Sequence, residues 1–281
     1  MEIFSRRRPY AGVLYCRCHH RSPVSPQAQK NEDLGRRLGI GLNLGAMGGG
    51  LAALASEKVV PRLLPKLEFS DVPLTAGQLR AMRDELSKGT RLPEPRDLEA
   101  RLPHRRLSTA EKRKYLKNQG FYRHKANAAV AHRTPSGGSL RGHIAAHELG
   151  HARIHNKPVL GKALRFGKGA QPLAMLLSTS LAGVGGVLDD DDPRRRLADV
   201  AQYGGAVAAA PTLIDEAYAS LKGYQALKKY VRNPEIRRAA RRDLLRAYGT
   251  YAAAAAPVIA APFAVKGIAT RIRDHMQNQE S

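Results

Sequence analysis

Aromatic residues are scarce in this chain: they make up 5% of its 281 residues, and tryptophan is absent. Hydrophobic residues make up 43%, enough for a core, and much of the apolar content is alanine, glycine, leucine and valine. Small side chains suit close packing between helices better than the core of a β-sandwich. The composition therefore predicts a mainly α-helical protein.

Cysteine is nearly absent: Cys16 and Cys18, followed by His19 and His20, are the only two. Two cysteines this close together define no disulfide framework, and the pattern lacks the second ligand pair of a zinc finger. Metal binding or lipid attachment is the alternative to two free cysteines in a flexible arm. The basic arm, residues 1–37, also lacks the layout of a cleaved secretory signal.

Acidic residues are few: 24 Asp and Glu stand against 47 Lys and Arg, which gives a net charge of +23 and a pI near 10.5. Such a balance implies an anionic partner, either a phospholipid surface or nucleic acid. One helical stripe could meet phosphates or form a solvated face, and it comprises Arg237, Arg238, Arg241, Arg242 and Arg246.

Charge is missing altogether from four stretches: 38–55, 169–188, 200–214 and 247–265. A bilayer crossing needs about 20 apolar residues, so the third stretch is short and the others are near the required length. The first stretch has glycine at every fourth position, which lets membrane helices touch. Because the mean hydropathy is only −0.40, the alternative is a bundle of buried, water-soluble helices.

The centre of the chain carries His147-Glu-Leu-Gly-His151, an HExxH pattern inside a run, 144–154, that predicts one helix. Residues four apart lie above one another, so both imidazoles face one point with Glu148 beside it. Two imidazoles and a third ligand hold zinc with one position open to water, whose pKa falls to about 7. Glu148 would take the proton as general base. Gly150, which has no side chain, would leave room for the substrate on the inner face of the helix. An ordinary amphipathic helix is the alternative.

A zinc site needs a third protein ligand. His155 lies about 12 Å from His147 on a continuous helix, too far to share an ion. The acidic residues 189–192 lie between two uncharged stretches and predict a solvated turn. Glu216 is the better candidate, because it lies in a run of helical periodicity that can pack against the first helix. Asp215 points to a different face, so only one of the two can ligate directly.

The HExxH run, the two uncharged segments after it and the sequence from Leu213 to Ser220 resemble the bacterial neutral zinc metallopeptidases. They resemble more distantly the membrane-embedded CAAX-prenyl-endopeptidase class, and both are of the gluzincin type. The resemblance covers about residues 126–227. It implies a zincin-like core with Zn²⁺ on His147, His151 and Glu216, and with Glu148 as general base. The chain departs from these families at Tyr218, where they usually carry Asp, which affects the groups around the ligands.

The expected organisation is mainly α with a small β element. The N-terminal half comprises a basic arm (1–37), an apolar Gly-rich helix as membrane anchor candidate (38–55) and a polar helical linker region (56–125). The metallopeptidase core (126–230) follows, with an inserted apolar hairpin (169–214). The last segment (231–281) comprises a basic helix, an apolar helix (247–265) and a C-terminal tail. Capping boxes at Thr75 with Gln78 and at Ser108 with Glu111 predict two short helices. Residues 126–132 predict an edge strand that an extended substrate could join.

These patterns together predict a membrane-associated, zinc-dependent endopeptidase that acts on a polypeptide substrate. The loop 189–199 has five Asp against three Arg, whereas 57–168 and 221–246 are densely basic, so the positive-inside rule places the catalytic side in the cytoplasm. The basic N-terminus fits this topology if 38–55 lies in the membrane without crossing it. The opposing hypothesis is a non-catalytic, basic structural or membrane-active protein, soluble or part of a virion, with a degenerate peptidase core.

Overall fold

The structure is a computed structural model that describes residues 25–64, 67–87, 91–97, 120–124, 127–131 and 140–280. The chain divides into two compact units, Met1–Arg36 and Arg37–Ser281. In the first unit, the start of helix α1 (Pro26–Leu54) carries an ion pair of 3.0 Å between Arg36 and Asp33. The rest of α1 and all later elements belong to the second unit. Cys16, Cys18 and the predicted capping box at Ser108 lie outside the described residues.

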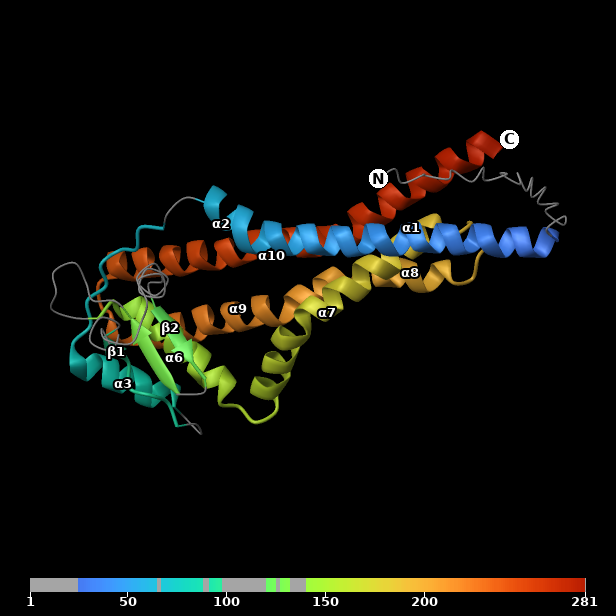
Figure 1. The fold of residues 1–281 in the computed structure, drawn as a ribbon. Helices are drawn as coiled ribbons and strands as arrows, with labels where there is room; N and C mark the ends of the chain where they lie inside the picture. Colours follow the sequence, from blue (N-terminus) through green and yellow to red (C-terminus); the bar gives the residue numbers. More distant parts are fainter. Residues whose placement is uncertain are drawn as a thin grey trace, which may run out of the picture. The chain divides into compact units, whose positions relative to one another are not determined.

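The prediction of a mainly helical chain is confirmed (Figure 1). After α1 the described helices are a π-helical turn η1 (Ala55–Val59), α2 (Val60–Leu63), α3 (Ala76–Leu86), α6 (Gly142–His155), α7 (Leu160–Val187), α8 (Arg195–Ala201), α9 (Gly204–Tyr230) and α10 (Pro234–Glu280). Helix α3 begins at the predicted capping box, in which the Thr75 side chain accepts from the Gln78 backbone N–H.

Three helical segments are long and apolar enough to cross a membrane: Pro26–Leu63, Leu160–Val187 and Pro234–Gln279. They hold the uncharged stretches that are near the length of a bilayer crossing. The short stretch 200–214 is broken instead, because α8 ends at Ala201 and α9 begins at Gly204.

Helix α1 lies against α7 with its backbone in direct contact. A methyl group at Gly41 would meet the Gly183 carbonyl oxygen at 2.7 Å, and one at Gly45 would meet the Ser180 Cα at 2.3 Å. The contacts move toward the start of α7 as α1 advances, so the two helices are antiparallel. Helix α1 runs alongside the apolar length of α7, so both helices cross a membrane or neither does. The prediction that 38–55 lies in the membrane without crossing it therefore requires the same of α7.

Helix α6 packs on the second half of α9, again through small residues. A methyl group at Gly150 would lie 2.5 Å from the Ala219 carbonyl oxygen, and one at Gly223 would lie 2.6 Å from that of Ala146. The largest apolar core surrounds this contact and joins α3 and the start of α10. Its fully buried members include Val72, Met82, Leu149 and Leu227.

Three short strands lie beside α6: β1 (Arg96–Asp97), β2 (Gly120–Arg123) and β3 (Ala128–Ala131). Their order is β1-β3-β2, with β3 parallel to β1 and antiparallel to β2. The prediction of an edge strand over 126–132 is therefore wrong, because β3 has a neighbour on both sides. An extended substrate cannot join the sheet at β3.

Candidate metal centre

The HExxH residues lie on one continuous helix, α6, whose inner face is buried against α9 (Figure 1). The helix begins where the Gly142 N–H donates to the Val72 carbonyl at 2.8 Å, which joins it to the segment before α3. His147 and His151 are each 8% exposed and Glu148 is 5% exposed. The helix thus holds the three polar side chains in a nearly water-free layer.

Glu216 of α9 meets both imidazoles. Its Oε2 lies 3.3 Å from His147 Nε2 and 3.4 Å from His151 Nε2, and the two Nε2 atoms are 3.1 Å apart. Ligands about 2.0–2.1 Å from a tetrahedral zinc ion lie about 3.3 Å from one another. The three atoms therefore have the spacing of one face of a zinc tetrahedron, and the group could hold a metal ion.

The other nitrogen of each imidazole has its own partner. His147 Nδ1 lies 3.2 Å from Ser220 Oγ, and His151 Nδ1 lies 2.9 Å from Asp215 Oδ1. If both Nδ1 atoms carry the proton and donate to these oxygens, both Nε2 lone pairs point toward Glu216. The two oxygens would hold the rings in the tautomer that a metal ligand needs once the Nε2 atoms carry no proton.

Asp215 collects further polar contacts. Its Oδ2 lies 2.9 Å from His155 Nε2 and also accepts from the Lys168 ammonium of α7. His151, His155 and Asp215 form a second group whose ligand atoms lie close enough to hold a metal ion. The Lys168 ammonium already supplies a positive charge there, so we assign Asp215 to orienting His151 rather than to ligation.

Burial and hydrogen bonds set opposite protonation states within the site. Burial works to lower the pKa of His151, but hydrogen bonds to Asp215 and Glu216 outweigh it and raise that pKa to about 10. Burial works to raise the pKa of Glu216, but hydrogen bonds from the two imidazoles lower it to about 2. Without a bound cation, these shifts favour an ionised Glu216 beside a protonated His151.

Glu148 behaves differently from Glu216. Burial raises the pKa of its carboxyl to about 8. The charge of His151 opposes this shift, whereas the charges of Glu216 and Asp215 add to it. A divalent cation among the ligands would favour the ionised form. The carboxyl is thus poised to hold or release a proton near neutral pH, as a general base requires.

No protein-family model, curated protein or solved structure matches this chain. His147, His151 and Glu216 are brought together, as the sequence predicted, and Glu148 is buried on the same helix. His155 is held by Asp215, away from the three ligand atoms.

One sequence-based role is wrong. Gly150 does not leave room for substrate, because it faces Ala219 of α9 and permits the two helices to touch. The acidic residues 189–192 form a largely exposed turn as predicted, and in it Asp189 pairs with Arg37 at 3.0 Å and Asp190 with Arg273 at 2.8 Å. Tyr218 lies outside the ligand group, where Lys157 Nζ is 5.4 Å from its ring centre.

Sequence reasoning missed the roles of Ser220, Lys168 and His155 around the ligands. The position of Ser220 could have been predicted from the sequence, since it follows Glu216 by four residues and so lies on the same helix face. The contact of Lys168 with Asp215 could not have been predicted, because it depends on how α7 crosses α9.

Proposed function

We propose that the chain is a membrane-bound, zinc-dependent endopeptidase. The observation that supports it best is the triangle of His147 Nε2, His151 Nε2 and Glu216 Oε2, with 3.1 to 3.4 Å between atoms and Glu148 in the same buried layer. The resemblance to gluzincin metallopeptidases implies the same three ligands.

The donor set fits zinc. Two imidazoles and one carboxylate are ligands typical of catalytic zinc, which keeps a position for water or substrate. Glu216 Oε2 is buried between the two Nε2 atoms, at 3.3 and 3.4 Å, so a cation among the three atoms would balance its charge. Bound there, zinc would lower the pKa of a water molecule and polarise the scissile carbonyl.

Other residues of the chain orient the ligands and transfer the proton. Ser220 and Asp215 fix the two imidazoles, and Lys168 and His155 fix Asp215. Glu148 accepts a proton from the attacking water and delivers it to the leaving nitrogen as the C–N bond breaks. The products are a carboxylate and an amine, so no other reactant is needed.

The three apolar helices support a membrane location. Residues 221–246, which lead from the site to the start of α10, carry nine Lys and Arg against two acidic residues. By the positive-inside rule we place this side, and with it the site, in the cytoplasm.

The test of the mechanism is Glu148→Gln. We expect zinc content to be unchanged and proteolysis to fall by at least about a hundredfold, because a general base contributes on that scale. Cleavage of a denatured protein substrate would be followed by mass spectrometry. Glu235→Gln, on the exposed start of α10, is the matched control. Full activity in Glu148→Gln would refute the assignment.

A further inference from the structure

The uncharged stretches of α1, α7 and α10 lie at the same level. Gly41 of α1 meets Gly183 of α7, and a methyl group at Gly186 of α7 would lie 2.6 Å from the Lys266 carbonyl oxygen of α10. Since every helix rises about 1.5 Å per residue, 38–55, 169–188 and 247–265 overlap along most of their length. Together they span close to the 30 Å of a hydrocarbon core.

The outward side of this layer is apolar. Large exposed side chains on the three helices include Leu42, Met47, Leu51, Leu173, Leu177, Leu181 and Phe263. So many large apolar side chains exposed over the same length of three adjacent helices are unusual for a water-soluble monomer. Lipid chains are the partner that these groups fit.

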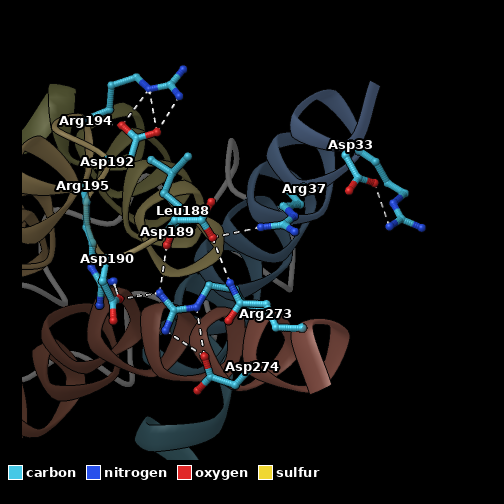
Figure 2. Close-up of polar contacts among 12 residues, drawn as sticks. Asp33, Arg37, Leu188, Asp189, Asp190, Asp192, Arg194, Arg195, Arg273 and Asp274 are labelled. Atoms are coloured by element: carbon cyan, nitrogen blue, oxygen red, sulfur yellow. Dashed lines mark hydrogen bonds and ion pairs between the residues drawn. The ribbon is translucent and has the colours of Figure 1, made fainter. Parts of the chain in front are cut away.

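Charged residues close the layer at the end of α7 (Figure 2). Arg273 of α10, only 7% exposed, donates to the Leu188 carbonyl at 2.9 Å and to Asp190 at 2.8 Å. Arg37 of α1 donates to Asp189 at 3.0 Å. All three helices thus meet one cluster of charges, which marks one boundary of the hydrocarbon layer.

The opposite end of the layer is strongly basic. Lys168 and Arg246 are the last charged residues before the uncharged stretches of α7 and α10. Arg238, Arg241 and Arg242 are exposed on α10 just beyond, and none forms an ion pair within the described part of the chain. Lipid phosphates would supply the missing anions.

The metal group lies at this basic boundary. A methyl group at Gly205 of α9 would lie 2.3 Å from the Val258 carbonyl oxygen of α10. The two helices follow one another through a short turn and run antiparallel, so Glu216, eleven residues on (216 − 205), is level with residue 247 (258 − 11). Residue 247 is where the uncharged stretch of α10 begins.

Helix α7 gives a second measure of the same depth. A methyl group at Gly167 would lie 2.6 Å from Pro211 Cγ, and Glu216 follows Pro211 by five residues (216 − 211). At about 1.5 Å per residue the ligand lies about 8 Å beyond Gly167. Gly167 is itself two residues outside the uncharged stretch that begins at 169, so this measure puts the ligand about 11 Å from the boundary, whereas the first puts it about level with the boundary. Headgroups extend about 5–8 Å from each face of the hydrocarbon core, so the two measures bracket that zone.

We propose that the site works in the headgroup layer of one leaflet, and that its substrate is the segment of a membrane-inserted polypeptide where it leaves the bilayer. The depth of the site follows from the helix register alone, whereas the substrate class rests on the proposed function. An extended chain covers about 3.3 Å per residue, so the cleaved bond lies within about five residues of the hydrocarbon boundary.

Spin-label depth tests the location. Nitroxides would be attached to Leu177→Cys, Ile214→Cys and Arg238→Cys in the full chain, with Cys16 and Cys18 replaced by Ser, in phosphatidylcholine and phosphatidylglycerol vesicles. We expect oxygen accessibility to be highest at 177, intermediate at 214 and lowest at 238, with a water-soluble nickel complex giving the reverse order. A label at 214 as deep as that at 177, or all three labels in water, would overturn the proposal.

Two libraries test the substrate class with the wild type and Glu148→Gln. One carries a randomised segment next to a transmembrane helix in the same vesicles, and the other carries it on a soluble carrier protein. We expect new termini only in the membrane-tethered library, near the bilayer, and only with the wild type. Equal cleavage of the soluble library would overturn the substrate class and leave the peptidase intact. No cleavage of either library would count against the proposed function, while the label depths still decide the location.

Discussion

Single residues around His147 and His151 decide whether the site can bind metal. Each imidazole is held at Nδ1 by an oxygen, so its Nε2 faces the carboxylate of Glu216. The sequence predicted the ligands because a four-residue spacing on a helix dictates that two rings share a face. It did not predict Lys168 or His155 as supports, because these contacts depend on how helices cross.

Asp215→Asn tests the orienting role. The amide keeps the shape but removes the charge opposite His151 Nδ1, so we expect zinc affinity to fall about ten- to a hundredfold. Competition with a fluorescent chelator measures the affinity. Asp191→Asn, an exposed acidic residue of the loop after α7, is the control and should bind zinc like the wild type. Equal affinity in both variants would contradict the role given to Asp215.

Zinc affinity should also depend on pH. With the pKa of His151 raised to about 10 by Asp215 and Glu216 against the effect of burial, a proton occupies this ligand at pH 7 and must leave when zinc binds. Affinity should therefore increase with pH from 7 toward 9, by about tenfold per unit for each proton released. Calorimetry in two buffers of different ionisation enthalpy counts the protons. Zinc binding at pH 7 without proton release would contradict the charge state assigned to His151.

At the scale of elements, α1 packs on α7 through glycines, where any larger side chain would displace the backbone of α7. The glycine ladder and the uncharged stretches predicted these helices, because their periodicity and length are local properties of the sequence. The position of β3 inside the sheet was not predictable, because β1, its parallel neighbour, consists of two residues with no pattern of its own.

Gly45→Ala tests the α1–α7 contact. Its methyl group would lie 2.3 Å from the Ser180 Cα, so backbone must move, and we expect the free energy of unfolding to fall by about 1–3 kcal/mol. Gly50→Ala is the matched control, since nothing lies within 4 Å of its Cβ, and it should raise stability by about 0.5–1 kcal/mol. Denaturant titration in detergent micelles measures both. An equal effect of the two substitutions would argue against close packing of α1 on α7.

At the scale of the whole molecule, the net charge of +23 and the three apolar helices both favour binding to an anionic membrane. Charge alone would bring the chain to an anionic surface, and salt would release it. We expect the chain to stay with phosphatidylcholine and phosphatidylglycerol vesicles through high salt and alkaline carbonate, as measured by flotation. Release by either treatment would show surface binding and would favour a bundle of buried, water-soluble helices.

The most direct measurement is the zinc content of the purified full chain after dialysis, compared with that of Glu216→Ala. A metal held by α6 and α9 predicts one zinc ion per wild-type chain and none in the variant, with both proteins equally helical by circular dichroism. No zinc in the wild type, or full zinc content in Glu216→Ala, would contradict the metal centre from which the proposed activity follows.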